Sequence, residues 1–153
     1  MNKLQQSIIL FVAQGAYSGR SPFAPGTAGT IIGMLLYLFF KERPLWIYLG
    51  VCAVVTALGS WAAGEAEKLL GKKDSPSIVI DEIAGFLVSM LLVPGTWQFM
   101  IAGFLLFRFF DILKPWPLRR LQDLPGGPGV VLDDIGAGLY TNIVLQVGAY
   151  ILK

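Results

Sequence analysis

The chain contains no histidine and only one cysteine, Cys52, which lies inside an apolar segment. These absences exclude several kinds of active site. Ser-His-Asp hydrolases and histidine phosphatases need an imidazole, and a cysteine phosphatase needs a thiolate among phosphate-binding donors. Neither a disulfide nor a Cys/His zinc site can form within the chain. The groups left for catalysis are carboxylates, Lys, Arg and hydroxyls, with a metal ion to assist them.

Charged residues are also scarce. They make up 14% of the 153 residues, whereas hydrophobic residues make up 55% and the mean hydropathy is +0.65. An ordinary soluble domain carries about 25% charged residues, so the deficit indicates that much of the surface faces lipid. The net charge of +2 gives no support to nucleic-acid binding, which needs a dense basic stripe, while anionic lipid headgroups remain suitable partners. The length predicts a single domain over residues 1–153.

Long apolar segments, separated by Pro, Gly and charged residues, predict an all-α fold: a polytopic membrane bundle of helices. A helix needs about 20 residues to span a bilayer, and residues 44–64 reach this length without their flanking turns. Residues 1–14 carry apolar side chains at helical spacing and predict an amphipathic helix that lies in the membrane interface or packs under the bundle. The expected bundle segments are 28–40, 44–64, 83–93, 97–107 and 135–152. The two shortest, 28–40 and 83–93, could instead be buried or partly inserted helices.

Following these segments back and forth places nearly all of the charges on one side of the membrane. The loop 15–27 and the stretches 65–82 and 108–134 share that side, which holds every acidic residue except Glu42 and most of the Lys and Arg residues. By the positive-inside rule this side is cytoplasmic. Avoidance of lipid alone does not explain the choice of one side. We therefore expect a multi-pass membrane protein whose site faces the cytoplasm.

Five acidic residues on this side are candidate metal ligands and catalytic groups. Two adjacent carboxylates interrupt an apolar stretch, and two more lie at the mouth of the last apolar segment. Burying a carboxylate costs several kcal/mol unless it is paired or bound to a metal, although helix starts and caps would give the same pattern. Clustered carboxylates repel one another, and oxygen ligands favour Mg²⁺ or Mn²⁺. The candidates are Asp81, Glu82, Asp111, Asp133 and Asp134.

Two further motifs offer groups that suit a phosphate. The Pro- and Gly-rich loop Gly19–Thr30 leads into a helix and contains Arg20 and Thr27; the alternative is a plain loop capped by Thr27. Arg108 and Lys114 flank Asp111 at three-residue spacing, which predicts one helical face. This face is either a ladder of surface ion pairs or a metal-binding carboxylate between phosphate-binding cations. We favour the second interpretation, because the patch lies at the end of a lipid-facing helix.

In order along nearly the whole chain, these motifs resemble those of the bacterial phosphatidylglycerophosphatase A family. The resemblance rests on residues 19–30, 80–82, 107–117 and 133–138, and the Lys-Pro-Trp-Pro stretch with its upstream Arg and Asp is the most distinctive part. It implies a Mg²⁺-dependent enzyme of the inner membrane, which removes the terminal phosphate of phosphatidylglycerophosphate. The products would be phosphatidylglycerol and inorganic phosphate, and the partner is a phospholipid substrate in the bilayer.

The sequence shares features with two other classes of membrane protein. A CDP-alcohol phosphatidyltransferase is also metal-dependent and membrane-bound, but its signature places Asp-Gly before Ala-Arg, and residues 133–138 lack the Arg. A small ion or phosphate transporter would need ionisable residues near mid-membrane, whereas these lie at segment ends. The Asp-x-Asp motif of haloacid-dehalogenase-type phosphatases is absent, which favours attack by water. The pattern does not separate metal ligands from the base, and it indicates no oligomeric state.

Overall fold

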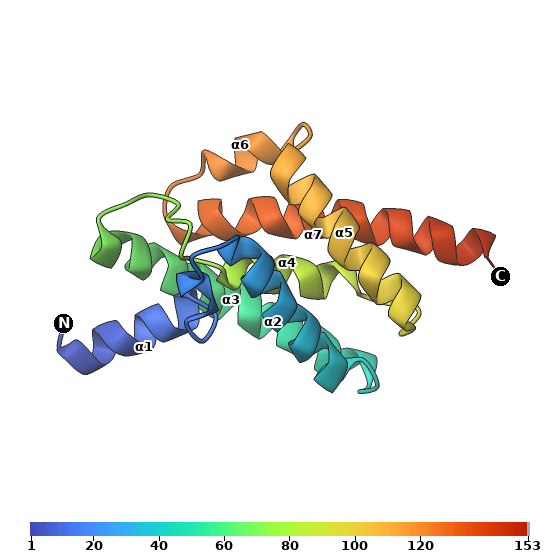
Figure 1. Cartoon of the computed structure of the whole chain (residues 1–153), viewed down its shortest axis with the longest axis horizontal. Helices are drawn as coiled ribbons and strands as arrows, with labels where there is room; N and C mark the ends of the chain where they lie inside the picture. The colour runs from blue at the N-terminus through green and yellow to red at the C-terminus, as the bar shows by residue number, and fades with distance from the viewer. Residues whose placement is uncertain (153) are drawn as a thin grey trace.

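The computed structural model describes residues 1–152 and shows only helices and loops over that range (Figure 1). The predicted all-α class is confirmed. The α-helices are α1 (Lys3–Ala13), α2 (Pro25–Phe40), α3 (Leu45–Leu70), α4 (Ile80–Ser89), α5 (Trp97–Leu113), α6 (Leu118–Gln122) and α7 (Gly127–Ile151), and a short 3-10 helix, η1 (Ser18–Arg20), precedes α2.

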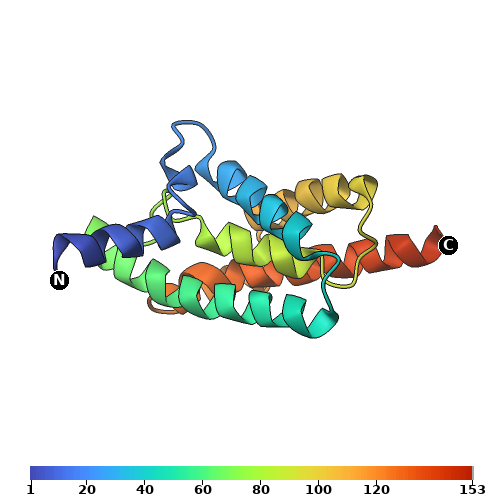
Figure 2. The same cartoon turned by 90° about the horizontal axis from the view of Figure 1, so that it is seen from below.

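Helix α4 is short and lies at the centre of the fold. It packs most extensively on α7, and also contacts α2, α3 and α5. Figures 1 and 2 show it enclosed between these longer helices. Its residues are buried except for the half-buried Glu82 and Val88, and the side chains of Phe86 and Leu87 are fully buried. Whatever α4 carries is therefore held by the other helices rather than by surrounding solvent or lipid.

Two glycines bring α4 and α7 into direct backbone contact. A Cβ atom added to Gly85 on α4 would lie 2.6 Å from the carbonyl oxygen of Asp134, and one added to Gly138 on α7 would lie 3.2 Å from the carbonyl carbon of Gly85. Small residues allow such close approach of helices in membranes. Asp81 and Asp134 lie one helical turn before these glycines, so the same crossing brings their side chains together.

Among residues 1–152, two helices, α3 and α7, are long and apolar enough to cross a membrane. Large apolar side chains are exposed along the outer surfaces of α2, α3, α5 and α7, whereas soluble monomers rarely expose contiguous apolar patches of more than a few hundred Å². Examples are Leu35, Phe39, Trp46, Val54, Leu58, Ile101, Leu105, Phe109, Ile143, Val147 and Tyr150. Helix α1 also exposes Leu4, Ile8 and Phe11, and it packs on α3.

Helix boundaries correct two interpretations made from the sequence. Helix α2 begins at Pro25, so Thr27 lies inside the helix and does not cap it; proline suits a first helical turn because its φ is already helical. Helix α7 begins at Gly127, also with a proline in its first turn. Asp133 and Asp134 are therefore interior residues of α7, and neither caps its start.

The expected segment 83–93 also differs from the structure. Helix α4 begins earlier, at Ile80, and ends at Ser89. The chain then turns through Leu92, whose φ of 57° is left-handed. An apolar sequence alone cannot mark this end, because Met90 to Val93 continue the apolar pattern while leaving the helix. The turn carries the chain into α5, which runs on to Leu113, well beyond the expected end at residue 107.

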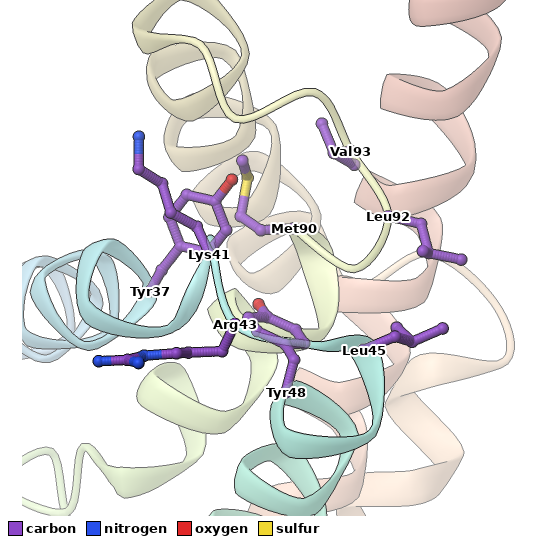
Figure 3. Close-up of a pocket in the computed structure, with 8 residues that line it drawn as sticks. All are labelled: Tyr37, Lys41, Arg43, Leu45, Tyr48, Met90, Leu92 and Val93. Atoms are coloured by element: carbon purple, nitrogen blue, oxygen red, sulfur yellow. The ribbon is translucent and has the colours of Figure 1, made fainter.

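A small hollow of about 140 Å³ lies where the α2–α3 and α4–α5 loops meet (Figure 3). The Tyr48 hydroxyl donates a hydrogen bond of 2.6 Å to the Leu87 carbonyl, and Lys41 Nζ donates one of 3.2 Å to the Gly95 carbonyl. The first bond joins α3 to α4, and the second joins the two loops. No carboxylate lines the hollow, so it lacks the groups that would bind a metal ion.

Candidate active site

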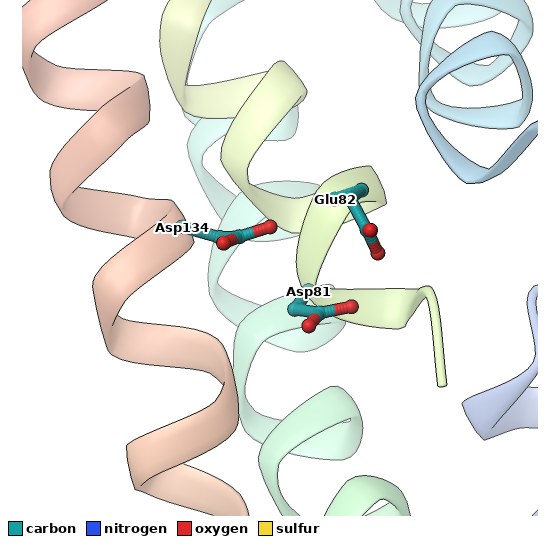
Figure 4. Close-up of side chains that lie close together, drawn as sticks. All are labelled: Asp81, Glu82 and Asp134. Atoms are coloured by element: carbon teal, nitrogen blue, oxygen red, sulfur yellow. The ribbon is translucent and has the colours of Figure 1, made fainter. Parts of the chain in front are cut away.

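Three carboxylates converge where the start of α4 meets α7 (Figure 4). One oxygen each from Asp81, Glu82 and Asp134 lies within 4.8 Å of the others. Figure 4 shows the Asp134 side chain extending from α7 toward the first turn of α4, which carries the other two. Asp81 is only 7% exposed and Asp134 only 3%. Adjacent residues of one helix and a residue of a second helix thus supply a shared, buried group of oxygens.

Each member of this three-carboxylate cluster has an oxygen without a hydrogen-bond partner. These atoms are Asp81 Oδ1, Glu82 Oε2 and Asp134 Oδ2, and all are buried. A buried charge without a partner costs several kcal/mol, and a divalent cation bound by the cluster would offset this cost. Because the donors are all carboxylate oxygens, the set suits Mg²⁺ or Mn²⁺ rather than zinc.

Burial and mutual repulsion shift the titration of the α4 carboxylates. Burial raises the pKa of Asp81 well above its usual range, and the charges of Glu82 and Asp134 raise it further. Burial likewise raises the pKa of Glu82, and the charge of Asp111 raises it further. A hydrogen bond with Asp81 and the charge of Arg108 lower it, but the net shift is upward. In the metal-free protein these groups therefore retain protons at a pH where an exposed carboxyl would be ionised.

A metal ion must displace these protons, so we expect the affinity for Mg²⁺ to increase as the pH rises from about 4, the ordinary carboxyl pKa, to neutrality and above, and binding to release protons. The sign follows from the raised pKa of Asp81, because the form that binds metal is the deprotonated one. Isothermal titration calorimetry in two buffers of different ionisation enthalpy measures both quantities. Affinity that is constant over this range, with no proton release, would contradict the expectation.

Arg108 on α5 connects the cluster to Asp111. Its Nη1 atom donates a hydrogen bond of 2.7 Å to Asp111 Oδ2 and lies 3.6 Å from Glu82 Oε1. Gly26, in the first turn of α2, packs against this pair. A Cβ there would lie 2.9 Å from Arg108 Nη1 and would collide with Glu82 Oε1. The first turn of α2 thus packs directly against the Arg108 guanidinium and the Glu82 carboxylate.

Lys114 reaches the site differently from the sequence expectation. It caps the end of α5 with a left-handed φ of 44°, so only Arg108 and Asp111 of the three-residue pattern share the helical face. Its Nζ atom donates instead to the carboxylate of Asp133 on α7. Burial alone would lower the pKa of Lys114, but the hydrogen bond and charge of Asp133 outweigh it and raise the pKa. Lys114 is therefore a firmly held cation at neutral pH.

The two phosphate-binding candidates of the first loop are not joined to the cluster by any hydrogen bond or ion pair within residues 1–152. Arg20 is exposed; its Nε donates to Gln14 Oε1 at 2.9 Å, and its guanidinium lies 4.1 Å from the centre of the Tyr17 ring. Thr27 is half-buried in α2. The residue of this loop that does pack on the cluster is Gly26, which the sequence offered only as part of a Pro-Gly turn.

A family model described as phosphatidylglycerophosphatase A matches residues 11–149. The chain belongs to this family. Two relatives are named phosphatidylglycerophosphatase A. The one from Escherichia coli K12 is 34% identical over 88% of this chain and 79% of its own. The one from Haemophilus influenzae Rd is 37% identical over 90% of this chain and 86% of its own. A Bacteroides thetaiotaomicron protein, 36% identical over 94% of both chains, carries the provisional name of a phosphatidylinositol-3-phosphatase. No solved structure matches the chain.

Proposed function

We propose that the protein is a lipid phosphatase that hydrolyses phosphatidylglycerophosphate to phosphatidylglycerol and inorganic phosphate. Membership of the phosphatidylglycerophosphatase A family and the names of two relatives support the substrate. The observation that carries the chemistry is the buried cluster of Asp81, Glu82 and Asp134 beside Arg108. A site with carboxylate oxygens for a metal ion and a guanidinium for phosphate oxygens suits hydrolysis of a phosphate monoester.

In this proposal Asp81, Glu82 and Asp134 hold Mg²⁺, which when bound supplies Lewis-acid polarisation of the phosphate. Arg108 stabilises the charge that develops on the phosphate oxygens, and Asp111 fixes the orientation of its guanidinium through their hydrogen bond. Lys114 adds a second positive charge.

Asp133 is the proposed base. One of its oxygens accepts from Lys114, and the other is buried without a partner. It takes a proton from the attacking water, whose oxygen bonds to phosphorus as the bond to the glycerol oxygen breaks. Lys114 keeps its own proton because its pKa is raised. The leaving glycerol oxygen is therefore protonated by solvent.

Removal of the metal ion provides the first test. We expect purified protein to release phosphate from phosphatidylglycerophosphate in mixed micelles only when Mg²⁺ or Mn²⁺ is present, and to stop in excess EDTA, because the carboxylates otherwise repel one another. Added Mg²⁺ should restore the rate. Full activity in EDTA would remove the metal from the mechanism. The same assay separates the alternatives, because a transporter releases no phosphate and a phosphatidyltransferase needs a CDP-linked lipid.

We further propose that the protein is a multi-pass protein of the inner membrane with this site at the cytoplasmic face. The exposed apolar surfaces of α2, α3, α5 and α7 support lipid contact. Helix α4 is too short to span and is enclosed by the others. Helix α1 lies in the interface in this arrangement, because it exposes Leu4, Ile8 and Phe11 on one face.

Topology can be tested with single cysteines placed at exposed positions. Lys72, Asp123 and Arg43 are all exposed, and the buried Cys52 can be replaced by Ala to give a background free of thiols. We expect membrane-impermeant maleimide applied to intact spheroplasts to label a cysteine at position 43 only, and to label positions 72 and 123 after lysis. Opposite accessibility of positions 72 and 123 would contradict convergence on one side.

A further inference from the structure

A second pocket, of about 400 Å³, opens beside Lys114. Leu113, Lys114, Pro115, Trp116 and Arg119 line it. Lys114 is the shared wall between this pocket and the carboxylates, because it also donates to Asp133, the neighbour of Asp134 in α7. A ligand that fills the pocket would therefore touch the lysine that pairs with Asp133, the proposed base.

Arg119 gives the pocket an available positive charge. It is exposed, its Nη2 atom donates only a long hydrogen bond of 3.4 Å to the Leu113 carbonyl, and within residues 1–152 no carboxylate forms an ion pair with it. Lys114, by contrast, is already paired with Asp133. Guanidinium groups bind phosphate oxygens through two parallel hydrogen bonds, so the chemistry of this pocket favours an anionic phosphate group.

An exposed tryptophan at the pocket suits it to the level of lipid headgroups. Trp116 is 74% exposed, and tryptophan is typical of the membrane interface. Ile112 and Phe109 are exposed along the neighbouring surface of α5, which offers acyl chains an apolar path away from the pocket. A lipid lying against α5 would thus bring the phosphate nearest its acyl chains to Lys114 and Arg119.

We propose that this pocket binds the phosphodiester group of the substrate, so that the enzyme recognises a lipid bearing two phosphates. The inference rests on the proposed function. In phosphatidylglycerophosphate a three-carbon glycerol unit separates the terminal monoester from the diester, and the two phosphates would lie on either side of Lys114. Phosphatidylinositol 3-phosphate shares this chemistry, with a monoester on a polyol joined through a diester. Phosphatidate has a single phosphate and would leave the pocket empty.

The test compares lipids with and without the diester. We would measure kcat/KM for phosphatidylglycerophosphate, phosphatidylinositol 3-phosphate and phosphatidate in the same mixed micelles. Arg119→Gln is expected to lower kcat/KM for phosphatidylglycerophosphate by about 10-fold, mainly by raising KM, and to leave phosphatidate hydrolysis unchanged. Arg119→Lys should retain part of the preference. Lys72→Gln, which removes an exposed cation from the same side, is the matched control and should change kcat/KM for neither lipid.

Each outcome is decisive. If Arg119→Gln lowers kcat/KM equally for phosphatidylglycerophosphate and phosphatidate, or for neither, the pocket does not bind the diester. The proposed phosphatase function is unaffected by that result. Phosphatidylglycerol retains the diester, so it should inhibit competitively, and Arg119→Gln should weaken that inhibition by a similar factor. If the wild-type protein cleaves phosphatidylinositol 3-phosphate and not phosphatidylglycerophosphate, the proposed substrate fails and the pocket is retained. If it cleaves neither of the two-phosphate lipids, both proposals fall.

Discussion

Replacing Asp134 with Asn is expected to lower the rate of phosphate release at low Mg²⁺ by about 10²-fold or more, a loss of roughly 2.7 kcal/mol in transition-state stabilisation. The substitution keeps the size of the side chain but removes a charge from the cluster formed with Asp81 and Glu82. Asp81→Asn should behave similarly. Because these variants weaken metal binding, high Mg²⁺ should restore part of the rate, which a Mg²⁺ titration of phosphate release measures.

Asp133 and Asp111 should respond differently, because each is already paired with a cation. Asp133→Asn removes the proposed base, so its loss of turnover should persist at any Mg²⁺ concentration. Asp111→Asn should chiefly weaken the hydrogen bond that orients the Arg108 guanidinium. Asp123→Asn is the control, since Asp123 is an exposed carboxylate on the same side. Near-normal turnover at low Mg²⁺ in all four site variants would mean that the carboxylates are structural.

Gly138→Ala is expected to cost about 3 kcal/mol of folding stability and most of the activity. The added methyl group would collide with the carbonyl oxygen of Gly85 and would lie 3.3 Å from Val88 Cβ, so α4 and α7 would have to separate. Separation would also move Asp81 away from Asp134. Thermal unfolding in detergent and phosphate release measure the two losses.

Gly148→Ala is the matched control for this variant. Gly148 lies in the same helix, but a Cβ there meets nothing within 4 Å. Alanine favours a helix over glycine by about 1 kcal/mol, so this variant should be as stable as the wild type or more so. Equal melting temperatures for the two alanine variants would show that α4 and α7 do not depend on close contact at Gly138.

The apolar and polar pattern could predict the helices and the side on which the acids gather, but not how the acids divide. The sequence does not distinguish among the five candidate carboxylates, Asp81, Glu82, Asp111, Asp133 and Asp134. In the structure, Asp81, Glu82 and Asp134 form one cluster. Asp111 forms an ion pair with Arg108, and Asp133 forms one with Lys114. That division depends on how each helix is rotated about its axis, and rotation depends on close contacts between residues distant in sequence.

Helix boundaries show a second limit of the sequence. The Gly-Pro-Gly stretch at residues 127–129 has the composition of a loop, yet it forms the first turn of α7. It can do so because α3 lies against it: a Cβ at Gly127 would meet the nitrogen of Gly64 at 2.9 Å. Since α7 starts there, Asp133 and Asp134 have distinct neighbours, as adjacent positions point about 100° apart on a helix.

The enclosure of α4 has a consequence for the order in which the protein is made. When α4 leaves the ribosome it carries Asp81 and Glu82, while Arg108 and Asp134 are still to be synthesised. Unpaired carboxylates are costly in hydrocarbon, so we expect α4 to remain at the membrane surface until α5 follows. Only the arrival of α7 completes its surroundings. Chains halted before residue 127 should therefore leave α4 accessible to proteases, although every residue of α4 is already present.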